Sequence, residues 1–147
     1  MRRIRVLHVD DDPDIREVVG ISLGLDTKLA VRSCASGGEA IAATAEWSPD
    51  LILLDVMMPD MDGPMTLMRL RECPQTATIP VVFMTARAQA GELHRILELG
   101  ALGVISKPFD PMTLATVVGR YLAGNGPISP LPGDDTEGYL GRAVSSL

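Results

Sequence analysis

Short runs of apolar residues alternate along the chain with segments whose apolar residues recur every three or four positions. Each run has the length and composition of a β-strand. The runs cover residues 4–9, 28–33, 51–55, 79–85 and 103–106. Those at 51–55 and 79–85 show no polar alternation, which is typical of strands covered on both faces. The pattern therefore predicts five strands, with the middle of the sheet fully buried.

The segments between these strands have the periodicity of amphipathic helices. Ser36 is suited to cap the second helix, Pro64 to open the third and Gly100 to end the fourth. The expected inner faces, from the first helix to the last, are Ile15, Val18, Val19, Ser22 and Leu23; Ala40, Ile41, Thr44 and Ala45; Met65, Met68 and Leu70; Leu93, Ile96 and Leu97; and Leu114, Val117, Val118, Tyr121 and Leu122. Strict alternation of strand and helix predicts an α/β, doubly wound parallel sheet with helices on both faces.

Polar groups directly follow several of the predicted strands. Residues 10–12 are three aspartates after the first strand, Asp55 ends the third, Thr85 ends the fourth, and Lys107 follows the fifth. In a parallel sheet these ends share one edge, where sites of this architecture lie. Crowded carboxylates repel one another unless a cation compensates, and oxygen ligands without Cys or His favour Mg²⁺. A carboxylate beside a metal, an ammonium and a hydroxyl indicates phosphoryl transfer with a covalent acceptor.

Four motifs carry a resemblance to a known family. They are VDDDP at 9–13, LDVMMPDMDG at 54–63, MTA at 84–86 and KPF at 107–109. Together and in this order they resemble the receiver domain of two-component response regulators, over about residues 3–123. The resemblance implies a flavodoxin-like sheet of strand order 2-1-3-4-5 with five helices.

The resemblance also implies roles for individual residues. Asp55 would be the phosphoacceptor, Thr85 would bind one phosphoryl oxygen, and Lys107 would pair with another. The family commonly has a cis peptide bond after this lysine, so we expect one between Lys107 and Pro108.

The same resemblance implies a magnesium site. Its ligands would be Asp10, Asp11 and Asp55, with the backbone carbonyl of Met57 as a further ligand. Asp12 matches an acidic position outside the metal shell.

The expected function is signalling rather than turnover of an external substrate. A sensor histidine kinase or a histidine phosphotransfer protein would supply the phosphoryl group, and an unidentified downstream protein would respond to altered contacts on the face of the fourth and fifth helices. Whether the chain forms a homodimer is not decided by the sequence. Three alternatives are a haloacid-dehalogenase-like phosphatase using Asp10, a flavin- or nucleotide-binding domain, and a non-phosphorylated interaction module. A nucleotide site would favour a glycine-rich loop after the first strand, and that loop is acidic here.

Two departures from the family pattern stand out. Val104 occupies the position, three before the lysine, where the family usually has Tyr or Phe. Met57 and Arg87 lie two residues after the acceptor and the threonine, beside the path of a hydrolytic water. We hypothesise that these two side chains prolong the phosphorylated lifetime.

Composition narrows the interpretation further. The formal net charge of −6 argues against non-specific binding to nucleic acid or to an anionic membrane. Cys34 and Cys73 have no disulfide or zinc spacing and are expected to be free thiols. Neither a signal peptide nor an apolar run of spanning length is present, so a cytoplasmic protein is expected.

Composition also divides the chain. Residues 1–123 form the expected receiver domain, and 124–147 a Gly- and Pro-rich tail without an output domain. We expect that tail to pack on its own domain or a neighbour, with a short helix around 139–144. His8, His94 and Trp47 are expected to be a packed strand residue, a helix-surface residue and a helix-end packing residue.

Overall fold

The computed structural model describes residues 2–86 and 89–124. Within these ranges, five parallel strands form one sheet in the order β2-β1-β3-β4-β5. The strands are β1 (Ile4–Val9), β2 (Leu29–Cys34), β3 (Leu51–Asp55), β4 (Val81–Thr85) and β5 (Gly103–Ser106). The helices between and after them are α1 (Pro13–Gly24), α2 (Gly37–Glu46), α3 (Gly63–Glu72), α4 (Ala90–Glu98) and α5 (Leu114–Leu122). The predicted fold class and strand order are confirmed.

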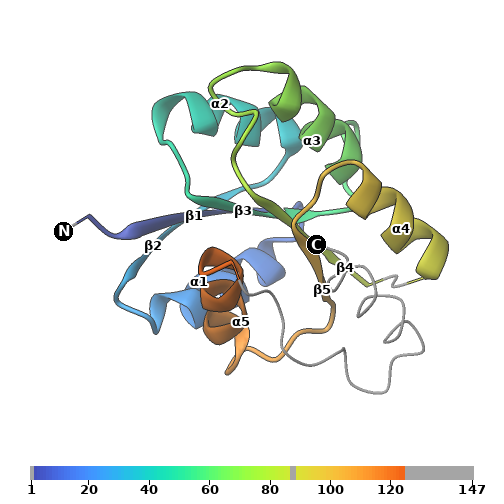
Figure 1. Cartoon of the computed structure of the whole chain (residues 1–147). Helices are drawn as coiled ribbons and strands as arrows, with labels where there is room; N and C mark the ends of the chain where they lie inside the picture. Colours follow the sequence, from blue (N-terminus) through green and yellow to red (C-terminus); the bar gives the residue numbers. More distant parts are fainter. Residues whose placement is uncertain (1, 87–88, 125–147) are drawn as a thin grey trace.

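Helices cover both faces of the sheet, with α2, α3 and α4 on one side and α1 and α5 on the other (Figure 1). Successive strand residues point to opposite faces, so each central strand contributes side chains to two hydrophobic cores, one on each face of the sheet. In β3, Ile52 and Leu54 pack toward α3 and α4, whereas Leu51 and Leu53 pack toward α1 and α5. All four side chains are completely buried, as the run without polar residues predicts.

Three of the predicted helix faces need correction. Met65 and Met68 were expected to pack in the core, but 44% and 55% of their surfaces are exposed. Thr66 and Leu67 are buried in their place. Thr66 can be buried because its hydroxyl donates to the carbonyl of Asp62 at 2.8 Å, which satisfies its polar group. On α1, Val18 is likewise 38% exposed, contrary to expectation. On α2, Ala45 was expected on the inner face but is exposed.

Strand and helix ends follow local chemistry. The run predicted from residue 79 pairs only from Val81, because Pro80 has no N–H for the ladder. The second strand begins and ends one residue later than predicted. Ser36 caps α2 as predicted, since its side chain accepts a hydrogen bond from the Glu39 N–H at 3.1 Å.

The register brings the strand ends together. Val9 pairs with Leu54, Asp55 with Met84, and Thr85 with Ser106, so β1, β3, β4 and β5 all end at one edge of the sheet. None of the described helices is long and apolar enough to cross a bilayer. The predicted tail lies outside the described residues from position 125 onward, as does its predicted helix.

Candidate functional site

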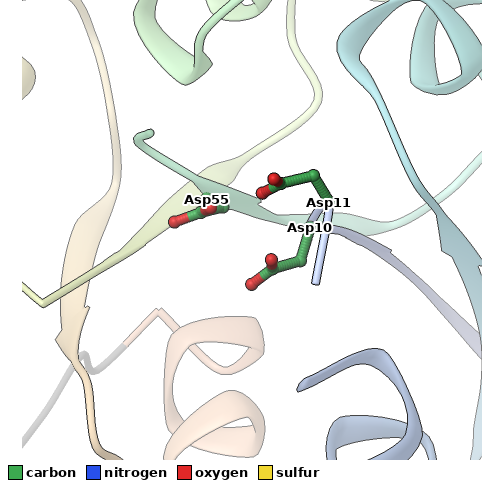
Figure 2. A group of neighbouring side chains, drawn as sticks. All are labelled: Asp10, Asp11 and Asp55. Atoms are coloured by element: carbon green, nitrogen blue, oxygen red, sulfur yellow. The ribbon is translucent and has the colours of Figure 1, made fainter. Parts of the chain in front are cut away.

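Three carboxylates gather where β1 and β3 end (Figure 2). Asp10, Asp11 and Asp55 each place one carboxylate oxygen within 4.8 Å of the others. Asp10 and Asp55 are buried, with 1% and 7% of their surfaces exposed, whereas Asp11 faces solvent. An all-oxygen cluster that is buried on one side and open on the other suits a hard divalent cation that keeps several of its waters.

Lys107 reaches back from the end of β5 to bridge two of these carboxylates. Its Nζ donates to Asp10 Oδ2 at 2.6 Å and to Asp55 Oδ1 at 3.1 Å. Only 16% of the lysine side chain is exposed, so little solvent screens these contacts. The lysine therefore lies on the buried side of the cluster, where water has little access and cannot take over the lysine's part in offsetting the negative charge.

The pKa values follow from this crowding. Burial, and next the negative charge of Asp10, raise the pKa of Asp55 above its usual range, although Lys107 opposes the change. Burial works against the charge of Lys107, yet its hydrogen bond to Asp10 and the charge of Asp55 outweigh burial and raise the lysine's pKa. Lys107 alone therefore does not offset the burial and the neighbouring charge that raise the pKa of Asp55. A further cation would relieve this, so the residues present fit a bound Mg²⁺.

The loop from β3 to α3 folds back tightly on the end of the strand. The Gly63 N–H donates to the Val56 carbonyl at 2.9 Å. A Cβ at Gly63 would lie 2.4 Å from the backbone oxygen of Asp55 and 2.8 Å from the Phe83 ring, so only glycine fits there. This turn fixes the backbone of Asp55 and of the following residues, including Met57, whose side chain is 57% exposed.

Neighbouring backbone and side chains hold Asp10 in place. The Asp12 N–H donates to Asp10 Oδ1 at 2.9 Å, and the Arg16 guanidinium donates to the Asp10 carbonyl at 2.8 Å. Asp12 also caps α1, accepting from the Asp14 N–H at 2.9 Å. Sequence reasoning missed Arg16, and the one available signal was its place in the first turn of the helix after the acidic motif.

Thr85 and Val104 complete the described surroundings. Thr85 ends β4 with 1% of its surface exposed, and its carbonyl accepts from the Lys107 N–H at 2.8 Å. The Lys107–Pro108 peptide bond is cis, as expected.

Val104 is buried in the core beneath α3 and α4, and the Tyr121 hydroxyl donates to its carbonyl at 3.4 Å from the other face. Arg87 lies outside the described residues.

The remaining candidates lie away from the carboxylates or inside the core. His8 is completely buried in β1, and neither ring nitrogen has a hydrogen-bond partner among the described residues. His94 is exposed on α4 and pairs with Glu98. Trp47 caps the C-terminal end of α2, and the guanidinium groups of Arg5 and Arg32 each lie 5.6 Å from its ring centre. Cys34 and Cys73 are both free thiols, as expected.

Comparison with known proteins decides between the interpretations of this edge. The family model described as "Response regulator receiver domain" matches residues 6–119. The chain belongs to the response regulator receiver family. This receiver assignment agrees with the four motifs and disfavours a haloacid-dehalogenase-like phosphatase.

Individual receivers and receiver-containing proteins are similar to the chain. Response regulator Rre1 of Synechocystis sp. is 38% identical over 120 residues, which are 82% of this chain and 52% of that protein. The signal transduction histidine-protein kinase BarA of Escherichia coli is 34% identical over 121 residues, 82% of this chain and 13% of that protein. The structure of chemotaxis protein CheY4 from Vibrio cholerae has a TM-score of 0.75 at 32% identity, covering 80% of this chain and 98% of that one. The receiver thus spans about half of Rre1 and a small part of BarA.

Proposed function

We propose that this receiver accepts a phosphoryl group on Asp55 and signals through altered protein contacts. The observation that carries the proposal is the position of Asp55, buried at a strand end. Its Oδ1 accepts a hydrogen bond from Lys107, and one of its carboxylate oxygens lies within 4.8 Å of one oxygen each of Asp10 and Asp11. Its carboxylate oxygen would attack the phosphorus of a phosphohistidine or of a small acyl phosphate. A new O–P bond would form while the bond to the leaving group breaks. The imidazole of a phosphohistidine would take up a proton from solvent as it leaves, whereas an acyl phosphate would leave as a carboxylate that needs none.

The surrounding residues would supply charge and position. Lys107 Nζ would donate to one phosphoryl oxygen as the negative charge shifts toward Asp55, and the Thr85 hydroxyl would donate to another. Mg²⁺ held by Asp10, Asp11, Asp55 and the Met57 carbonyl would offset the charge on the transferring group. Gly63 has no side chain, so the loop after β3 can pack directly against the backbone of Asp55 and would keep it in place.

The proposed donor is a sensor histidine kinase or a histidine phosphotransfer protein. Support comes from the family and from the likeness to BarA, a histidine kinase that contains a segment like this chain. The output would be a change in the conformers of the face formed by α4, β5 and α5, read by a downstream protein. Val104 is buried at that face, so any coupling proceeds without an aromatic side chain at its position.

The experiment is the intact mass of the full chain after incubation with Mg²⁺ and a small acyl phosphate, beside the Asp55→Asn variant. The proposal expects one phosphoryl adduct that is absent from the variant and lost when the metal is chelated. An adduct that survives Asp55→Asn and disappears in Asp10→Asn would support the phosphatase-like alternative instead. No adduct from the acyl phosphate or from a phosphorylated kinase domain would leave the non-phosphorylated interaction module.

A further inference from the structure

A cavity of about 510 Å³ lies between the loop after β3 and helix α4. This volume is within the range of sites that bind ligands or peptide side chains. Its lining is largely apolar and includes Val56, Met58, Pro64 and Ile96. The cavity is thus suited to receive large apolar side chains, and it adjoins the carboxylate site at Met57, which belongs to both.

Charged groups at this cavity are available to a partner. Arg95 and Glu92 of α4 line it together with Asp62. Among the described residues, neither Arg95 nor Glu92 has an ion-pair partner, and Arg95 is exposed. Asp62 already accepts a hydrogen bond from the Met65 N–H at 2.9 Å. A complementary occupant would bring apolar side chains, an acidic group for Arg95 and a basic group for the acids.

The chain itself contains a segment with this pattern. Residues 134–142 read DDTEGYLGR, in which acidic residues come first, then Tyr139 and Leu140, then Arg142. We propose that this segment docks in the cavity between the loop after β3 and α4. Tyr139 and Leu140 would fill the apolar part, the acidic residues would face Arg95, and Arg142 would face the acids. The segment lies outside the described residues. Its apolar and charged side chains complement the cavity, and the chain that connects it to α5 is long enough to reach.

The connecting chain is long enough. Asp134 lies ten positions after Gly124, and an extended chain of ten residue steps spans about 33 Å. A domain of this size has a radius of gyration of about 14 Å, so the connection can pass around it from the end of α5. Tethering also gives the segment a high effective concentration at its own domain, which favours docking within one chain.

A second cavity is a poorer match. It has a volume of about 330 Å³, lies between α1 and α5, and is lined by Leu25, Met112 and Asp26 among others. Asp26 is its one charged lining residue and would repel the acidic part of the segment. Elsewhere in residues 125–147, Ile128 and Leu131 have prolines rather than charges beside them, so they match the rim of the first cavity less well.

The docking does not require phosphorylation, so it stands or falls separately from the role of Asp55. Its test uses the methionine methyl signals of the full chain in a ¹³C–¹H spectrum. An aromatic ring shifts the signals of methyl groups that it contacts, and Met57 and Met58 both line the cavity. Met112 lies between α1 and α5 and serves as an internal reference. The variants are Tyr139→Ser and, as matched control, Leu131→Ser.

The proposal expects Tyr139→Ser to shift the Met57 or Met58 signal while the Met112 signal stays in place. Leu131→Ser should leave all three unchanged, and Arg95→Glu should reproduce the effect of Tyr139→Ser. Unmoved Met57 and Met58 signals would overturn the proposal, and so would a shift confined to Met112. A shift that disappears on dilution would overturn it as well, because the segment would then be bound by a second copy.

Discussion

The ammonium group of Lys107 lies 2.6 Å from Asp10 Oδ2 although 97 residues separate the two in the chain. The contact exists because β1 and β5 end at the same edge of a parallel sheet, on either side of β3 and β4. Asp55 at the end of β3 accepts from the same ammonium group at 3.1 Å. One lysine thus bridges two buried carboxylates, and the proposed phosphoryl transfer assigns it a central part.

Replacing that lysine should slow phosphorylation without unfolding the chain. We expect Lys107→Gln to reduce the rate of adduct formation roughly 100-fold, the usual effect of losing a donor aimed at a charge that develops during reaction. Lys28→Gln, a change at the chain's other lysine, is the matched control and should leave the rate unchanged. Time-resolved intact mass measures both rates. Equal rates for the parent chain and Lys107→Gln would remove the lysine from the mechanism.

The buried imidazole of His8 should make stability depend on pH. Burial lowers its pKa from 6.5 to about 4, with Asp10 opposing the change and Lys107 adding to it. In the unfolded chain, His8 takes up a proton as the pH falls below 6.5, whereas in the folded chain it does so only near pH 4. The free energy of unfolding therefore decreases as the pH falls through this window. The loss amounts to roughly 3 kcal/mol across that window.

The comparison is with His8→Leu, which lacks the titrating group. Denaturant unfolding in the presence of a chelator, at neutral pH and again within the window, measures the difference between the two proteins. The variant should be the more stable protein at both pH values, because it removes two buried nitrogens without partners, and its advantage should grow on acidification. A difference that stays constant with pH would contradict the buried, neutral imidazole.

Gly63 should tolerate no side chain. The added methyl group of Gly63→Ala would meet the Asp55 backbone oxygen at 2.4 Å and the Val56 Cα at 2.9 Å, so the backbone must move. We expect a loss of about 1–3 kcal/mol in the free energy of unfolding, together with slower phosphorylation. Gly20→Ala in α1 is the control, because its methyl group meets nothing within 4 Å. That change should be neutral or stabilising by about 0.5–1 kcal/mol.

The exposed side chain of Met57 provides a test of the phosphorylated lifetime. If it obstructs water near the acyl phosphate, Met57→Asn should shorten the half-life of the adduct several-fold, because the amide can position water where the thioether excludes it. Met112→Asn, at the 79% exposed Met112, is the matched control. Decay of the adduct mass after removal of the phosphodonor gives both half-lives. An unchanged or longer half-life for Met57→Asn would contradict the hypothesis.

Much of the architecture could be predicted because its signals are local. Runs such as 51–55 mark buried strands, and the parallel order then places Asp10, Asp55 and Lys107 at one edge. The predicted inner faces of helices were wrong at positions where a residue's hydropathy does not match its burial. Met65 and Met68 are apolar yet exposed, whereas Thr66 is buried because Asp62 accepts its hydroxyl hydrogen bond.

Other features depend on approaches between chain segments that no local pattern reveals. The close fit of Gly63 against Asp55 arises from the return of the loop across the strand end. The support that Arg16 gives to the Asp10 carbonyl depends on how α1 starts. The unpartnered nitrogens of His8 became evident only once the neighbours on both sides of β1 were placed.

The most direct test of the account is to locate the phosphoryl group on the full chain. Reduction of the phosphorylated protein with borohydride converts an aspartyl phosphate into homoserine, and peptide sequencing by mass spectrometry then identifies the position. The account predicts homoserine at Asp55 alone, formed only when the metal and the phosphodonor are both present. Homoserine at Asp10, or at any position other than Asp55, would contradict it.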